Sequence, residues 1–225
     1  MTIVIWDGND LLVDRITTIT QSDITGADGK PRPYYVELDN SKIYLASDHK
    51  WEAKVWGRNI KAFTMVGDTE HRHCWLNFLE TGDDVHSLAE TAKNFQHLLS
   101  PNAEYIVIDE DNVLHVFEAT HVEFRSNYYS TPARKPIIFG CAEAVELLNN
   151  VFTSAENKLS PLECMVIAQA HYPVLGRRFD HWNAESNILT RDNDLSDRAR
   201  HWVASRAVKK ISVNSKPRPV NIVNR

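Results

Sequence analysis

The chain has 225 residues, of which 43% are hydrophobic and 24% charged, and its formal net charge is −5. This size fits one globular domain, and no run of about 18 apolar residues indicates a membrane-spanning helix. Its three cysteines, Cys74, Cys141 and Cys164, lack the short paired spacing of a disulfide framework or a zinc knuckle. We therefore expect a reducing, cytoplasmic setting. The start of the sequence has no basic-then-apolar leader, which predicts that there is no signal peptide.

The first fourteen residues predict a β-hairpin. Two apolar runs, at 3–6 and 11–13, flank an Asp-Gly turn at 7–10, which is a typical hairpin pattern. Since the aminopeptidase that removes initiator methionines acts before small residues, we expect Met1 to be lost before Thr2. Thr2 would then carry a free α-amine beside its hydroxyl, so one residue would supply both a nucleophile and a base.

The pattern continues with strands and then two helices. Strands are predicted at 15–20, 34–38, 42–46 and 60–66, with a Gly- and Pro-rich loop at 26–33 and a turn at 39–40. A helix is predicted after Gly67-Asp68-Thr69, because Cys74, Trp75, Phe78 and Leu79 form an apolar stripe at helical spacing. A second helix is predicted from Asp83 to Leu99, ended by Pro101.

The second half repeats this order. A hairpin is predicted from 105–108 and 113–117, with strands at 121–124 and 136–140, and a helix from Cys141. Ser160-Pro161-Leu162-Glu163 is a helix start with a capping box. A last helix is predicted from Asp194 or Ser196 to Ala207, before an extended segment at 216–219. Strand blocks alternating with helix pairs predict an α+β domain of antiparallel sheets covered by helices.

Several stretches resemble the proteasome β-subunit family of N-terminal nucleophile (Ntn) hydrolases, particularly its short phage and bacterial forms. The opening is similar to the family's Thr-Thr-Ile strand, Asp-Gly turn and strand ending in Ala-Asp-Arg, which here reads Val13-Asp14-Arg15. Lys42-Ile43 resembles the Lys that starts a following strand. The stretches at 63–68, 105–117 and 138–145 resemble the strand before the first helix, the middle hairpin and the start of the third helix. The resemblance covers residues 1 to about 180.

This resemblance implies a four-layer αββα sandwich and a threonine-type peptidase that needs no cofactor or metal. It implies that Thr2 is the nucleophile, that Asp14 orients Lys42, and that Lys42 lowers the pKa of the amine or relays protons. It further implies that the backbone amide near Gly67 stabilises the oxyanion, and that Cys141 occupies the position next to the amine. A homo-oligomer, a dimer or a ring, and a peptide or protein substrate are the expected partners.

The chain departs from the family in three places. Matching Thr2-Ile3 to the family's Thr-Ile puts Met1 at the nucleophile position, whereas a shift in the hairpin puts Thr2 there. Cys141 replaces a Ser, and the corner at 170–180 has no Asp-x-x-Ser. The alternative function is therefore a catalytically inactive, proteasome-like protein that serves assembly or partner binding.

Two other groups of residues are weaker candidates for a functional site. His71 and His73 on a helix point about 200° apart, so they cannot share one metal ion, while His71 and Cys74 supply only two ligands. Gly140-Cys141 at a helix start is an alternative cysteine nucleophile, and a buried structural Cys is the simpler interpretation.

The C-terminal segment is basic. Residues 191–225 contain nine Lys/Arg against three Asp/Glu, so this segment carries +6 and residues 1–190 carry −11. We predict a proteasome-like domain over 1–190 and a basic helix and extended tail over 191–225. The tail is a solvated extension, or it binds an acidic patch on a neighbouring subunit or nucleic acid. Only Trp202 supplies an aromatic side chain for the last of these.

Overall fold

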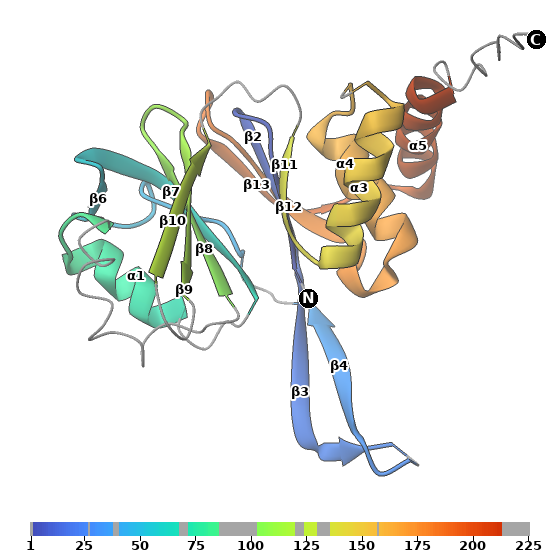
Figure 1. The fold of residues 1–225 in the computed structure, drawn as a ribbon, viewed down its shortest axis with the longest axis horizontal. Coiled ribbons are helices and arrows are strands. Elements are labelled where there is room, and N and C mark those ends of the chain that lie inside the picture. The colour runs from blue at the N-terminus through green and yellow to red at the C-terminus, as the bar shows by residue number, and fades with distance from the viewer. Residues whose placement is uncertain are drawn as a thin grey trace, which may run out of the picture.

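The structure of the chain is a computed structural model. It describes residues 2–26, 28–37, 41–67, 72–85, 103–119, 124–129, 136–156 and 158–212. In this part of the chain the fold is mixed α+β, with two larger antiparallel sheets, a separate hairpin and four α-helices (Figure 1). The predicted α+β class is thus confirmed.

The first sheet contains the opening hairpin. Its strand order is β11-β1-β2-β12-β13, with bounds Ile137–Gly140, Ile3–Trp6, Asp10–Asp14, Arg178–Asn183 and Ile188–Asp194. Alternate residues of β1 face opposite sides, because side chains along a strand alternate. Ile3 and Ile5 join an apolar cluster with α3 and α4, whereas Val4 and Trp6 join a cluster with the second sheet. Both faces are covered, which explains why β1 is apolar throughout.

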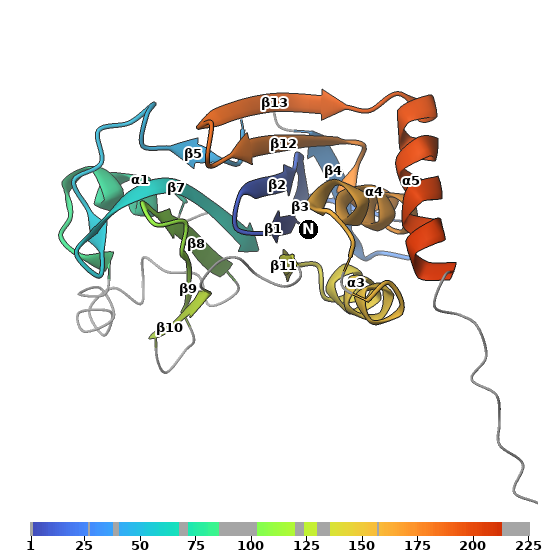
Figure 2. The same cartoon turned by 90° about the horizontal axis from the view of Figure 1, so that it is seen from above.

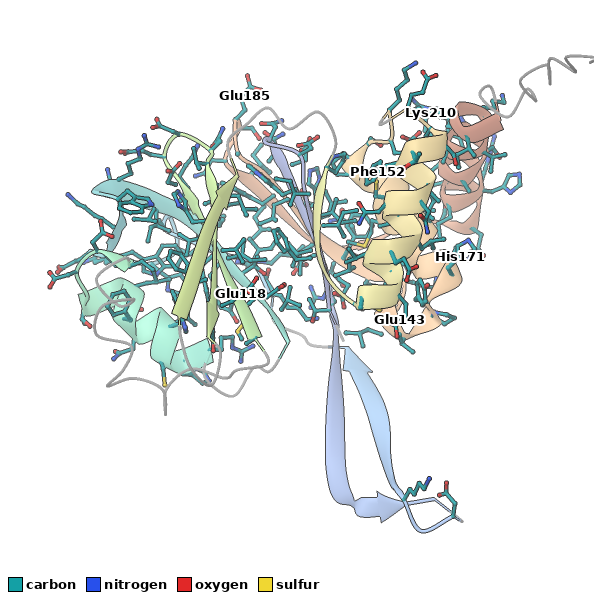
Figure 3. All side chains as sticks on the ribbon, viewed as in Figure 1. Glu118, Glu143, Phe152, His171, Glu185 and Lys210 are labelled. Carbon is teal, nitrogen blue, oxygen red and sulfur yellow. The ribbon has the colours of Figure 1, made fainter. Side chains whose placement is uncertain are left out.

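The second sheet has the order β10-β9-β8-β7-β5. Its strands span Phe124–Tyr129, Leu114–Ala119, Ala103–Asp109, Arg58–Gly67 and Tyr44–Leu45, and the short β6 (Lys54–Val55) pairs with β7. Phe63 and Tyr105 pack with Trp75 of α1 (Arg72–Thr81), and Ala62 and Ile106 pack with residues of the first sheet. Side chains fill the space between the two sheets (Figure 3).

The helices cover the outer faces of the sheets. α3 (Ala142–Ser154) and α4 (Pro161–His171) lie on the first sheet, α5 (Asp197–Ser212) packs against α4 and α3, and α1 lies on the second sheet (Figures 1 and 2). α4 begins with the predicted capping box, in which the Ser160 side chain accepts from the Glu163 amide and the Glu163 carboxylate accepts from the Ser160 amide. Ser196 likewise accepts from the Ala199 amide at the start of α5.

The hairpin of β3 (Ile16–Thr25) and β4 (Pro31–Glu37) projects from the body (Figure 1). Because β3 starts two residues after Asp14 and β4 returns opposite Ile16, the chain comes back toward its starting point before Lys42. The predicted loop at 26–33 is wrong in part, since β4 begins at Pro31. A two-stranded hairpin has only edge strands, and edge strands tolerate proline.

The structure contains two strands that the sequence did not predict. β12 and β13 pair with each other, and β12 also pairs with β2. The domain boundary predicted after residue 190 falls within β13, and Ala207 of α5 is buried in the cluster beneath α3 and α4. The turn at 39–40, the helix cap at 68–69, most of the helix predicted at 83–99 and the extended segment at 216–219 lie outside the described residues.

Candidate functional site

Thr2 lies at the start of β1 and is buried, with 6% of its surface exposed. Its carbonyl oxygen accepts a hydrogen bond from the Cys141 amide at 3.0 Å, next to the pairing of Ile3 with Gly140. Gly140 has φ +115°, and a Cβ there would approach the Thr2 carbonyl oxygen to 1.9 Å. Only glycine allows this approach, so β11 holds the start of β1 in one position.

Lys42 connects the Thr2 hydroxyl to the interior. It lies just before β5, has 6% of its surface exposed, and its Nζ is 3.1 Å from Thr2 Oγ1. The same Nζ donates to Asp14 Oδ2 at 3.2 Å and to the Ile16 carbonyl oxygen. Burial lowers the pKa of Lys42, and the Asp14 carboxylate opposes this shift. A lysine with a lowered pKa holds its proton less tightly, so a larger fraction of the amine is neutral near pH 7 and able to act as a base.

Asp14 ends β2 and is fully buried. Besides Lys42, it accepts hydrogen bonds from the Ile3 amide at 2.7 Å and from the Ile16 amide at 3.0 Å. Burial raises the pKa of Asp14, and Lys42 and the two amides oppose this shift. One carboxylate therefore ties together the start of β1, the start of β3 and the lysine.

Asp180 of β12 is a second buried carboxylate beside this cluster, and the sequence analysis missed it. It accepts from the Lys42 amide at 3.3 Å, from the Asp192 amide at 2.9 Å and from Arg15 Nη1 at 3.3 Å. It therefore fixes the backbone that carries Lys42. The sequence pattern that could have indicated it is a single acidic residue between Phe179 and Trp182, inside a segment that is otherwise suited to a buried strand.

Cys141 contributes its backbone to the cluster, and its side chain points elsewhere. Its Sγ lies 3.2 Å from the carboxylate of Glu143, which Figure 3 labels at the start of α3. Burial raises the pKa of the Cys141 thiol, and Glu143 adds to this shift. An activated thiol needs the opposite shift, so the geometry does not favour a cysteine nucleophile.

Gly67 ends β7 with φ +90°, a conformation that favours glycine. Figure 2 shows that the C-terminal end of β7 points toward the N-terminal end of the chain. Among the described residues, no hydrogen bond joins Gly67 to Thr2. The structure thus joins Thr2, Lys42, Asp14 and the Cys141 amide by hydrogen bonds, and within the described residues Gly67 has no hydrogen bond to this group.

The Thr2 hydroxyl faces Lys42, and Val4 pairs with Val13. In this register of the opening strand, the Thr2 side chain lies at the candidate site. Met1 and His71 lie outside the described residues. Within the described ranges, no group of three His, Cys, Asp or Glu is arranged to hold a metal ion.

The arrangement can support nucleophilic chemistry. A hydroxyl within hydrogen-bond distance of an amine that a third group orients is the general pattern of an activated nucleophile. None of the helices in the described part of the chain combines the length and hydropathy of a membrane span. Comparison of the sequence with protein-family models and with curated proteins finds no match, so the geometry of the site carries the functional argument.

Proposed function

We propose that this chain is an Ntn hydrolase of the proteasome β-subunit type, a threonine peptidase with a four-layer αββα sandwich. One observation carries the proposal: the buried Lys42 Nζ lies 3.1 Å from Thr2 Oγ1 and 3.2 Å from Asp14 Oδ2. Burying an ion pair can cost more free energy in desolvation than the pairing returns. An ion pair that is buried against a threonine hydroxyl is therefore consistent with a catalytic use.

The arrangement of layers supports the fold part of the proposal. Apolar residues of both sheets meet in one cluster, and separate clusters form beneath α1 on one side and beneath α3, α4 and α5 on the other. This order of helix, sheet, sheet and helix is what the family resemblance implies. The hydroxyl and the lysine lie at the end of β1 where the chain enters the sandwich.

The mechanism requires Thr2 to become the first residue. The Thr2 hydroxyl then attacks the carbonyl carbon of a peptide bond, and its proton passes to neutral Lys42 or to the α-amine. The tetrahedral intermediate collapses, the amine product leaves with that proton, and an ester between Thr2 and the acyl product remains. Water hydrolyses the ester and restores the hydroxyl. The Gly67 amide is the candidate donor to the oxyanion.

Intact-mass spectrometry tests this mechanism directly. The mature protein should begin at Thr2, and a peptide epoxyketone should add once to it. Thr2→Ala should abolish both labelling and peptide hydrolysis, whereas Thr2→Ser should keep part of both. Thr153→Ala on the exposed face of α3 is the matched control and should behave as wild type. Mature protein that retains a residue before Thr2 would rule the mechanism out.

The second candidate is a non-catalytic, proteasome-like protein that serves assembly or partner binding. Two observations favour it. Cys141 turns its thiol toward Glu143 and supplies no hydroxyl near Thr2, and α5 exposes 59% of Trp202 and 61% of Val208. Light scattering after size-exclusion chromatography should then show an oligomer that Trp202→Asp disrupts, without epoxyketone labelling. Hydrolysis that depends on Thr2 would exclude this candidate.

A further inference from the structure

Two glutamates lie directly opposite each other in the second sheet. Glu104 of β8 pairs with Glu118 of β9, and Val66 of β7 is the partner of Glu104 on its other side. Like charges that face each other on neighbouring strands destabilise a sheet. Both side chains are half-buried, so water screens the repulsion between them only in part. The pairing therefore costs free energy unless a positive charge lies nearby.

The pair faces the space between the two sheets. Side chains along a strand alternate, and the neighbours of the pair on the same face, Val66, Ile106 and Val116, belong to the apolar cluster that joins the sheets. Figure 3 labels Glu118 at the end of the second sheet where β7 also ends. Figure 2 shows that this end of β7 points toward the N-terminal end of the chain.

The charges of the pair are not balanced by the described protein. Within the described residues neither glutamate forms an ion pair, and Glu104 Oε2 is shielded from solvent without a hydrogen-bond partner. Burial raises the pKa of Glu104, and the charge of Glu118 raises it further. A buried carboxylate oxygen without a donor is unusual, so the geometry indicates a ligand that brings positive charge.

A third oxygen without a partner lies on the same face. Thr64 precedes Val66 by two residues on β7, so it lies diagonally from Glu104 across the two strands. Thr64 is fully buried, and its hydroxyl oxygen has no hydrogen-bond partner in the described part of the chain. A buried hydroxyl is normally paired, because burial without a partner costs free energy. Two carboxylates and a hydroxyl thus share one face, and two of these three groups have a buried oxygen without a partner.

We propose that Glu104, Glu118 and the Thr64 hydroxyl bind a divalent cation of the Ca²⁺ or Mg²⁺ class between β7, β8 and β9. These cations take oxygen ligands, and Mg²⁺ is commonly held by one or two carboxylates while water completes its shell. Both glutamates are partly exposed, so water can reach the bound ion. The ion neutralises the pair, gives the buried oxygens a partner and joins the end of β7 to the two neighbouring strands. The site is independent of the proposed peptidase chemistry.

Titration calorimetry on the full chain, freed of metal with EDTA, tests the site with CaCl₂ and MgCl₂ as separate arms and NaCl as a third. The wild type should bind one divalent ion. Glu104→Gln and Glu118→Gln should each weaken binding by at least the roughly 10- to 100-fold that loss of a supporting partner costs a metal site. Thr64→Val should weaken binding less, since it removes a neutral ligand. Glu146→Gln, on the exposed face of α3, is the matched control and should bind as the wild type does.

Thermal unfolding gives a second readout of the same site. In EDTA, Glu118→Gln should unfold at a higher temperature than the wild type, because the repulsion within the pair is removed. Saturating Ca²⁺ or Mg²⁺ should stabilise the wild type and reverse this order, since a ligand stabilises only the folded protein that binds it. Both readouts can be obtained if the chain hydrolyses nothing, so the proposed function can fail while the cation site stands.

Three results would overturn the inference. The first is a wild type that binds neither divalent ion, or binds Na⁺ as tightly. The second is equal binding by Glu104→Gln, Glu118→Gln and the Glu146→Gln control. The third concerns Arg125 of β10, whose backbone pairs with that of Glu118. Binding that appears only in Arg125→Gln would mean that the protein itself supplies the positive charge.

Discussion

Two buried aspartates illustrate the difference between a structural ion cluster and a candidate reaction site. Asp14 and Asp109 are both fully buried, and each accepts hydrogen bonds from two backbone amides. Each also has a cationic partner, Lys42 at 3.2 Å for Asp14 and Arg58 at 3.3 Å for Asp109. Burial and hydrogen bonding alone therefore do not distinguish them.

The two clusters differ in the second partner of each cation. The Lys42 side chain is only 7% exposed and its second side-chain partner is the Thr2 hydroxyl. The Arg58 side chain is 45% exposed and also pairs with Asp111 in the turn. Asp109 also contacts the buried His115 at 3.0 Å, and none of the hydrogen bonds that Asp109 makes within the described residues involves a hydroxyl or a thiol. A buried carboxylate marks a candidate site only when its partner also reaches a group that can react.

Lys42→Met should give the largest effect. Removal of the candidate base should lower epoxyketone labelling and hydrolysis by roughly a thousandfold, as expected for general-base catalysis. It also leaves Asp14 buried without its cation, which costs about 3–5 kcal/mol of folding free energy. Labelling rates with urea denaturation measure both. A variant that folds and is labelled at the wild-type rate would remove Lys42 from the mechanism.

Asp14→Asn should change the pH dependence. The Asp14 carboxylate raises the pKa of Lys42 against the effect of burial, so its neutralisation should lower that pKa further. The labelling rate rises with pH as Lys42 loses its proton, and this rise should therefore move to lower pH in the variant. The pH profile of labelling checks the shift, with Asp111→Asn as the exposed control. A shift to higher pH would contradict the assignment of Lys42 as the base.

Much of the fold follows from local sequence pattern. The opening hairpin, the 105–117 hairpin and the Ser160 capping box depend on neighbouring residues, and the structure has all three. β12 and β13 were missed because their signal is not local. β13 is mostly exposed and polar, and Asp180 interrupts β12 with a charge whose partners lie far away in sequence.

The candidate site likewise depends on contacts between residues that are distant in sequence. The meeting of Asp14 with Lys42 was expected only through a family resemblance, since 28 residues and a projecting hairpin separate them. The register of Thr2 could not be decided from the sequence, because a shift of one residue exchanges the two faces of a strand. The Thr2 backbone is positioned by the close approach of Gly140 to the Thr2 carbonyl, which is a contact between β1 and β11.

Asp109→Asn should affect stability and leave activity unchanged. Oδ1 accepts from the Asp111 and Val113 amides and remains in Asn. Oδ2 lies 3.0 Å from His115 Nε2 and accepts from Arg58 Nη1 at 3.3 Å, and in Asn an NH2 donor takes its place beside these groups. An unpaired buried donor costs about 1–3 kcal/mol, so a loss of about 2 kcal/mol is expected in urea denaturation. Labelling of Thr2 per folded molecule should equal that of the wild type. Loss of labelling in folded protein would break the distinction between the two aspartates.

Arg58→Gln should give the smallest loss of stability, and it is the substitution that corresponds most directly to Lys42→Met. Both substitutions remove one cation from a buried aspartate, yet the Arg58 side chain is 45% exposed, so water can replace it. Pairs that solvent reaches contribute about 0.2–1 kcal/mol and weaken with salt. We expect a loss of about 0.5 kcal/mol that shrinks at 0.5 M NaCl, measured beside Lys42→Met under the same conditions. A loss for Arg58→Gln as large as that for Lys42→Met would mean that exposure of the cation does not separate the two clusters.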